Sequence, residues 1–297
     1  MTSMGYKIIE IDSLLKNYES DINLRMESYK KKKKELLSKG QTLPEFANGY
    51  EYFGVHRIRG GWVYREWAPA ADAMYLMGDF NDWNKSSHPM QKLDNGIFEI
   101  TLKTKELWHG CRIKAVVVNG DQVLERIPLY ATRVEQDPET YLWTGVVWHP
   151  KKKYEWNDEG FKGEKIPYIY ECHIGVGTYK EFKENILPRI KKLGYNTIQI
   201  MAVMEHPYYG SFGYQVSNFY AASSRYGKPE ELKELIDTAH QMGIQVLLDV
   251  VHSHAVKNTN EGINEFDGTV EQFFHVGKMG EHSAWDTMKF YISYYPI

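Results

Sequence analysis

The chain has 297 residues, a length that allows one large domain or two to three ordinary ones. Apolar residues make up 42% and charged residues 25% of the chain, and no apolar run approaches the roughly 20 residues of a membrane span, so we expect no membrane partner. The net charge of −3 gives no support to nucleic acid as a partner.

The cysteines, the first residues and the aromatic content bear on the redox chemistry, the location and the ligand of the protein. Cys111 and Cys172 lie far apart without CxxC spacing, so we predict buried free thiols and neither a disulfide framework nor a thiolate metal site. Nothing else in the sequence indicates a cofactor. The first residues lack a basic segment followed by an apolar core, so we expect a cytoplasmic location. The 22 Tyr and 8 Trp favour a sugar ligand, because aromatic faces pack against pyranose rings.

Residues 1–48 are predicted to form a helical leader. The segment is polar, and its apolar residues recur at helical intervals before Gly40 and Pro44 end the pattern. These apolar residues are Ile8, Ile11, Leu14, Leu15 and Tyr18.

Residues 49–150 are predicted to form an all-β, immunoglobulin-like sandwich. Four short β-rich runs cover residues 62–67, 74–77, 97–102 and 113–118. Turn clusters at residues 94–96 and 119–121 separate them, with the spacing expected of a small antiparallel sandwich. Residues 151–165 are polar and lack a periodic apolar pattern, so we interpret them as a linker.

Residues 166–297 show an alternating β-α-β-α-β pattern. Apolar runs at 168–170, 197–201 and 246–251 alternate with amphipathic stretches at 187–193 and 229–242. Pro188 fits the first turn of the earlier helix, and Gly194 and Gly243 follow the ends of the two helices.

Such apolar strands indicate a parallel sheet covered by helices, either an open doubly wound sheet or part of a barrel. Since no GxGxxG or Walker sequence follows the first strand, we favour part of an eight-stranded barrel; the resemblance described below implies that this part is the first three strands of a truncated (β/α)8 TIM barrel. The predicted fold is therefore multidomain, a β-sandwich followed by this incomplete barrel.

Polar residues gather where these strands end, at the edge where functional groups of parallel sheets meet. Asp249 lies inside the apolar run VLLDVV, where a carboxylate needs hydrogen-bond partners, and His252 and His254 follow it. One interpretation is a functional network. An alternative is a metal-dependent hydrolase, because His252 and His254 are spaced to point both imidazoles at one ion.

The stretch from MEHPYYGSFGYQ to LLDVVHSHA resembles the first motif region of the α-amylase superfamily in its 1,4-α-glucan branching-enzyme form. Upstream, YREWAP and GDFNDWN resemble the carbohydrate-binding sandwich module that precedes the barrel in branching enzymes. The resemblance covers about residues 45–285 and implies α-glucan partners such as glycogen, amylose and amylopectin.

The resemblance implies roles for particular residues. Tyr214 would stack beneath the glucose ring at the cleavage subsite, His254 would bond a hydroxyl of that sugar, and Asp249 would anchor the network. Trp67, Pro69, Asn95 and Gly96 would form the glucan surface of the module, while Trp83 is expected to be a structural core residue.

The reaction of such enzymes is a retaining double displacement that uses one carboxylate as nucleophile and a second as acid. In the family both belong to motifs at later strands, so we identify no catalytic residue here and predict an inactive chain. The carboxylates after Asp249 lie in a region without expected strands; they are Glu261, Glu265, Asp267, Glu271 and Asp286. A second hypothesis is therefore an α-glucan-binding module without catalysis.

Two departures from the family pattern stand out. The segment HIGVGTYKEF looks shorter than the usual connection after the first strand, and WDTMKFYISYYPI stops resembling the family near Asp286. We expect the sandwich to be stable alone and residues 166–297 not to be, because apolar strand faces would lack later neighbours. The residues on these faces are Ile198, Ile200, Val246 and Leu248.

Overall fold

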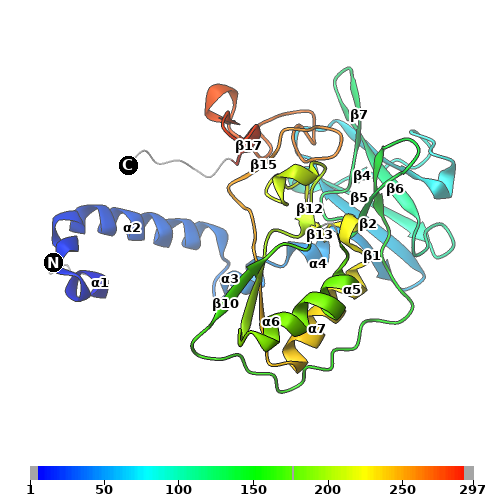
Figure 1. Cartoon of the computed structure of the whole chain (residues 1–297). Coiled ribbons are helices and arrows are strands. Elements are labelled where there is room, and N and C mark those ends of the chain that lie inside the picture. The colour runs from blue at the N-terminus through cyan, green and yellow to red at the C-terminus, as the bar shows by residue number, and fades with distance from the viewer. Residues whose placement is uncertain (1–5, 176, 291–297) are drawn as a thin grey trace. The chain divides into compact units, whose positions relative to one another are not determined.

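The computed structural model describes residues 6–175 and 177–290. Residues up to Tyr52 form one compact unit and those from Phe53 onward form another (Figure 1). The first unit is helical, as predicted, with helices continuing past residue 48, and Lys30 to Lys34 lie exposed on its longest helix. Its elements are α1 (Lys7–Ile11), the 3-10 helix η1 (Ser13–Tyr18), α2 (Glu19–Leu36), α3 (Leu43–Phe46) and α4 (Gly49–Tyr52). Within the described residues, none of the helices has the length and apolar character needed to cross a bilayer.

Two antiparallel sheets follow from Gly54. The first has the order β1-β2-β5-β4; its strands are β1 (Gly54–Ile58), β2 (Gly61–Trp67), β4 (Gln91–Lys92) and β5 (Ile97–Lys103). The second has the order β3-β6-β9-β8, with β7 also paired to β6. Its strands are β3 (Ala73–Gly78), β6 (Arg112–Asn119), β7 (Gln122–Arg126), β8 (Val134–Gln136) and β9 (Trp143–Val146). The four predicted β-rich runs correspond to β2, β3, β5 and β6.

The two sheets share one apolar core. Tyr64 of β2 and Phe98 of β5 pack with Leu76 of β3 and Val117 of β6, all at most 1% exposed. This core makes the two sheets a sandwich; its immunoglobulin-like character and the domain limits stay predictions. Cys111 is buried in it, and Cys172 is buried in the core of the following domain, as predicted.

Trp83 is not a core residue, contrary to our expectation. Its ring is half-buried in a surface turn, where Nε1 donates to Asp79 Oδ1 at 3.2 Å and the guanidinium of Arg112 lies over the ring. Arg112 also pairs with Asp79 at 3.0 Å. The indole therefore supports the GDFNDWN turn through polar contacts.

Residues 151–165 have no helix or strand, but they are bound to the protein along their length. Tyr154 and Asn157 donate to Asp237 of α7 (Pro229–Gln241), and Asp158 contacts His240 at 2.6 Å. Phe161 stacks on the same His240 ring. The predicted linker is therefore a strap fixed to α7.

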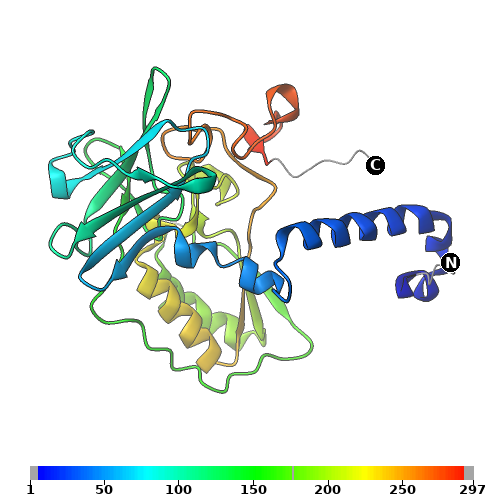
Figure 2. The same cartoon turned by 180° about the vertical axis from the view of Figure 1, so that it is seen from behind.

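A three-stranded parallel sheet follows, in the order β10 (Ile169–Cys172), β11 (Thr197–Ile200) and β14 (Gln245–Leu248). The helices α6 (Leu187–Lys192) and α7 lie side by side on one face of it (Figures 1 and 2). These are the parallel strands and covering helices that the sequence predicts; their assignment to an incomplete (β/α)8 barrel stays a prediction. Gly194 and Gly243 end the helices with φ of +88° and +72°.

The first of these helices begins earlier than predicted. Thr178 caps α5 (Tyr179–Glu181), and a π-helical segment (Phe182–Ile186) joins it to α6. Pro188 therefore lies inside a continuous helical segment rather than in its first turn. A proline there lacks an N–H and crowds the preceding carbonyls, and the π turn just before it supplies the change in hydrogen-bond register.

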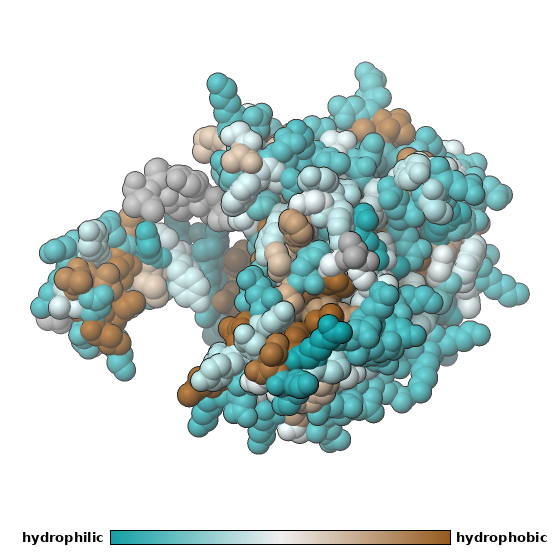
Figure 3. All heavy atoms as spheres, viewed as in Figure 1, coloured by the Kyte–Doolittle hydropathy of each residue, from teal (hydrophilic) through white to brown (hydrophobic). Residues whose placement is uncertain are grey.

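The sheet faces are covered differently from our expectation. Ile198 and Ile200 are fully buried under the helices, whereas Leu247 and Leu248 on β14 are 42% and 44% exposed. Apolar side chains interrupt the mostly polar surface in the region of β10 (Figure 3). The uncovered apolar surface thus lies at the edges of the sheet and not over its centre.

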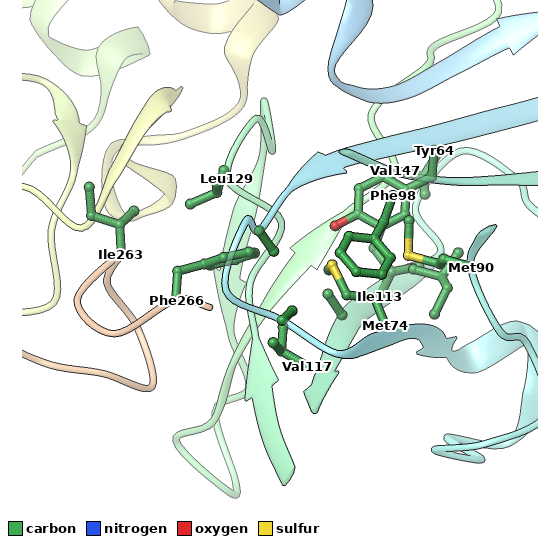
Figure 4. Packing of buried hydrophobic residues seen from close by; sticks show 14 of the residues in the cluster. Tyr64, Met74, Met90, Phe98, Ile113, Val117, Leu129, Val147, Ile263 and Phe266 are labelled. Carbon is green, nitrogen blue, oxygen red and sulfur yellow. The ribbon is translucent and has the colours of Figure 1, made fainter. Parts of the chain in front are cut away.

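Residues after Asp249 are more ordered than predicted. The hairpin β12 (Met204–Glu205) with β13 (Asn218–Ala222) precedes them, and β15 (His254–Val256), β16 (Glu281–His282) and β17 (Thr287–Lys289) form a small antiparallel sheet. Ile263, Phe266 and Phe274, from the loop between β15 and β16, join the sandwich core. Figure 4 shows Ile263 and Phe266 beside Leu129 of the module. The sandwich core is therefore completed by the following domain, so we no longer expect the sandwich to be stable alone.

Candidate functional site

A tight turn presents Tyr214 to the carboxyl ends of the parallel strands. Phe212 and Gly213 adopt φ of +54° and +88° in succession. A Cβ on Gly213 would lie 1.9 Å from the carbonyl oxygen of Ala202, so only glycine fits there. The sequence SFGYQ thus fixes where the Tyr214 ring leaves the backbone.

The three residues predicted at this site lie together. The Tyr214 hydroxyl donates to Asp249 Oδ2 at 2.6 Å, and His254 Nε2 lies 2.8 Å from the Tyr214 carbonyl oxygen. Since a carbonyl only accepts, Nε2 carries the proton and Nδ1 accepts from Ser253 Oγ at 3.1 Å. Partial burial, together with the Asp249 carboxylate, raises the pKa of Tyr214 to about 12, so its hydroxyl stays a donor.

Tyr214 and His254 line an open cavity of about 690 Å³. Its other walls include the rings of Tyr208 and Trp285, which are 61% and 56% exposed. The Trp285 ring centroid lies 5.1 Å from that of His254, and Gln215 Nε2 donates to the Trp285 carbonyl at 2.8 Å. Exposed aromatic faces beside hydrogen-bonding groups are suited to sugar rings.

The cavity offers few groups for covalent chemistry. Among the lining residues that the structure describes, Asp286 is the single carboxylate, and it pairs with Lys257. The two ring nitrogens of His254 are engaged by Ser253 and Tyr214, so a sugar hydroxyl would have to replace one of those contacts. The described cavity thus offers ring faces and hydrogen-bonding groups, without a pair of carboxylates among its described lining residues.

The four residues predicted on the module also lie together, and none of them lines this cavity. Trp67 Nε1 donates to the carbonyl of Asn95 at 3.0 Å. A Cβ on Gly96 would lie 2.4 Å from Pro69 Cα, so Gly96 permits the close approach of the two loops. Pro69 and Asn95 are exposed, and Trp67 is half-buried.

The metal hypothesis predicts that His252 and His254 face one ion. In the structure His252 lines a separate apolar cavity of about 340 Å³ with Trp67 and Phe219, whereas His254 lines the Tyr214 cavity. Among the described residues, no group of three or more His, Cys, Asp or Glu side chains is placed to hold a metal. The two imidazoles do not converge, so the geometry does not support this alternative.

Comparison with known families finds a match for the sandwich module and a match for the domain that follows it. Residues 52–138 match Carbohydrate-binding module 48 (Isoamylase N-terminal domain), and residues 175–289 match the Alpha amylase, catalytic domain. Curated relatives named 1,4-alpha-glucan-branching enzyme align with 98% of the chain. The chain matches the amino-terminal part of 1,4-α-glucan-branching enzymes. This finding confirms the resemblance predicted from the sequence.

The branching-enzyme relatives include those from Rhizophagus irregularis and Felis catus, each 45% identical to this chain. The chain spans 44% of the length of each. A solved structure, a putative alpha amylase from Salmonella typhimurium, is 22% identical with a TM-score of 0.64, covering 80% of this chain and 38% of that one. The structural likeness supports an amylase-like fold.

The structure adds residues that we missed. The catalytic-domain match ends at residue 289, close to Asp286, near which we expected the resemblance to stop. Sequence reasoning assigned no role to Tyr208, Gln215 or Trp285, which line the cavity. The surplus of aromatic residues pointed to such side chains without identifying them.

Proposed function

We propose that this chain is the amino-terminal portion of a 1,4-α-glucan branching enzyme and that it binds α-glucan. The observation that carries the proposal is the convergence of Tyr214 with Asp249 and His254 of a second segment, beside one cavity with aromatic walls. The family match and the 45% identity to branching enzymes support the choice of glucan over other sugars. The module surface at Trp67 and Pro69 is the second proposed contact.

Binding without reaction is the expected behaviour of residues 1–297. A retaining transfer needs two carboxylates about 5 Å apart, and the described cavity presents Asp286 already paired with Lys257. We therefore expect no change in the iodine-stained spectrum of amylose incubated with the purified chain. A spectral change absent from a mock purification would overturn this part of the proposal.

Affinity electrophoresis tests glucan binding directly. The chain should migrate more slowly in a gel containing glycogen, and Trp67→Ala should weaken the apparent affinity about three- to tenfold, since ring stacking contributes about 0.5–1.5 kcal/mol. Trp108→Ala is the matched control, because Trp108 is an exposed indole of the same module that is 46% accessible. Equal mobility of the unmutated chain with and without glycogen would contradict the proposal.

A further inference from the structure

A loop of the catalytic-domain part contacts the module directly beneath its proposed glucan surface. Asp267 is fully buried, and its Oδ2 accepts a hydrogen bond from the backbone N–H of Ala70 at 3.0 Å. Its Oδ1 accepts from the N–H and hydroxyl of Thr269 at 3.0 and 2.7 Å. Both carboxylate oxygens are therefore committed, one of them to the module.

Gln272 provides a second contact from the same loop. Its Nε2 donates to the carbonyl of Trp67 at 2.7 Å, and its Oε1 accepts from the N–H of Asp267 at 3.0 Å. The Phe273 ring meets the Trp67 indole edge to face, with centroids 5.9 Å apart. Asp267 and Gln272 thus bracket Pro69, holding the backbone on both sides of it.

The module fixes the same segment less completely by itself. Ala68 N–H donates to the Gly96 carbonyl at 2.9 Å, and Trp67 Nε1 donates to the Asn95 carbonyl. These bonds join residues 67–69 to residues 95–96. The Trp67 carbonyl and the Ala70 N–H find their partners across the domain boundary, in Gln272 and Asp267.

Further contacts hold the loop itself in place. Arg126 of β7, 3% exposed, donates through Nη2 to the carbonyl of Glu265 at 2.9 Å, and Asn119 donates to the carbonyl of Asp267 at 3.0 Å. A Cβ on Gly268 would lie 2.8 Å from the Asn119 side chain, so the close approach requires glycine. The loop therefore contacts the module at the β6–β7 hairpin and at the connection between β2 and β3.

We propose that Asp267 and Gln272 are positioning residues for the glucan surface of the module: they hold the backbone that carries Trp67 and Pro69 in its binding geometry. The inference rests on the proposed function of that surface. A bond to a carboxylate contributes more than a neutral one, and its loss leaves the Ala70 N–H without the partner that it has in the structure. The surface would then sample conformations in which Trp67 and Pro69 no longer lie side by side, and glucan affinity would fall.

The test compares two neutralising substitutions in the full chain. In Asp267→Asn the amide nitrogen faces either the Ala70 or the Thr269 N–H, so one contact is lost. Glu271→Gln removes the same charge from an exposed side chain in the same loop. We expect a three- to tenfold loss of apparent glycogen affinity for Asp267→Asn, an unchanged value for Glu271→Gln, and a loss for Gln272→Met, which keeps side-chain length but removes both bonds.

A double-mutant cycle separates positioning from general destabilisation. If Asp267 acts through Trp67, Asp267→Asn should cause no further loss in the Trp67→Ala background. The Trp67 fluorescence, obtained as the difference between each protein and its Trp67→Phe version, should also shift in Asp267→Asn well below its melting temperature.

Each outcome has a distinct meaning. Equal affinity losses in the Trp67 and Trp67→Ala backgrounds, or an Asp267→Asn chain that binds like Glu271→Gln, would overturn the positioning role while leaving the proposed function intact. Full binding by Trp67→Ala alone would overturn the assignment of the surface, and the positioning role with it.

Discussion

Glu66 shows how a single buried group can make stability depend on pH. The carboxyl group is fully buried in the module and accepts hydrogen bonds from the Tyr64 hydroxyl and from the N–H groups of Leu129 and Trp67. Burial raises the pKa of Glu66 to about 7, although the three hydrogen bonds favour the charged form. The folded chain therefore holds this proton more tightly than the unfolded chain does.

The direction of the effect follows from linkage. The folded pKa lies above the unfolded value of 4.5, so the stabilisation is fully present below pH 4.5 and is lost as the pH rises through 7. We expect Glu66→Gln to be less stable than the unmutated chain at pH 5 and to lose most of that disadvantage by pH 8, a change of about 3 kcal/mol. Denaturant unfolding of both proteins at the two pH values measures this difference. A stability gap that is the same at both would contradict the assignment.

Local pattern in the sequence drew attention to Asp249 and His254 after an apolar strand, whereas the role of Tyr214 came from the resemblance to branching enzymes. The structure joins the three residues by hydrogen bonds. Trp285 and Asp267 could not be assigned in this way, since each acquires its partner from a segment more than 65 residues distant. In the sequence, Asp267 cannot be distinguished from other aspartates in loops, because its burial and its bond to Ala70 exist only in the folded chain.

At the scale of elements, apolar strands were easier to predict than strands of mixed sequence. The β2, β3, β5 and β6 runs are rich in apolar and aromatic residues, whereas the edge strand β1 has the mixed sequence GVHRI. The sequence TYKE did contain a signal that we missed, since Thr178 and Glu181 form a capping box. Because proline favours first turns, Pro188 led us to predict a helix start at residue 187, eight residues after the observed start at Tyr179.

The strap along α7 leads to a prediction of its own. Asp237 is buried and accepts from Tyr154 Oη at 2.8 Å and from Asn157 N and Nδ2 at 3.0 and 2.9 Å. Asp237→Ala should release residues 151–165, whose lysines are trypsin sites. The free energy needed to detach the strap should fall by roughly 1.4 kcal/mol relative to the unmutated chain, so trypsin should cleave these residues about tenfold faster.

Timed digestion with mass spectrometry of the first fragments measures that rate. Glu234→Ala is the matched control, because Glu234 lies on the same helix but pairs with Lys183 at 2.7 Å. Unchanged cleavage between residues 151 and 165 in Asp237→Ala would show that other contacts hold the strap.

At the scale of the whole molecule, the shared core predicts one cooperative unit from Phe53 onward. Phe266 is fully buried in the sandwich core although it lies after β15. Phe266→Ala should lower the free energy of unfolding by about 3–5 kcal/mol, and near-UV and far-UV circular dichroism should report one coincident transition at lower denaturant. Two separated transitions, with the module's unaffected by the substitution, would restore our earlier expectation of an independent sandwich.

The strap also determines how two glucan contacts would act on one polymer. If residues 151–165 were free, they would form a flexible tether with a widely fluctuating end-to-end distance of about 20 Å. The effective concentration of the Tyr214 cavity for a glucan already bound at the module surface would then depend on that fluctuating distance. Because Asp237 and His240 hold the strap, it does not act as a free tether between the module surface and the Tyr214 cavity. A glucan long enough to reach both sites would meet them at a separation that no flexible linker varies, whereas a shorter chain would contact one site at a time.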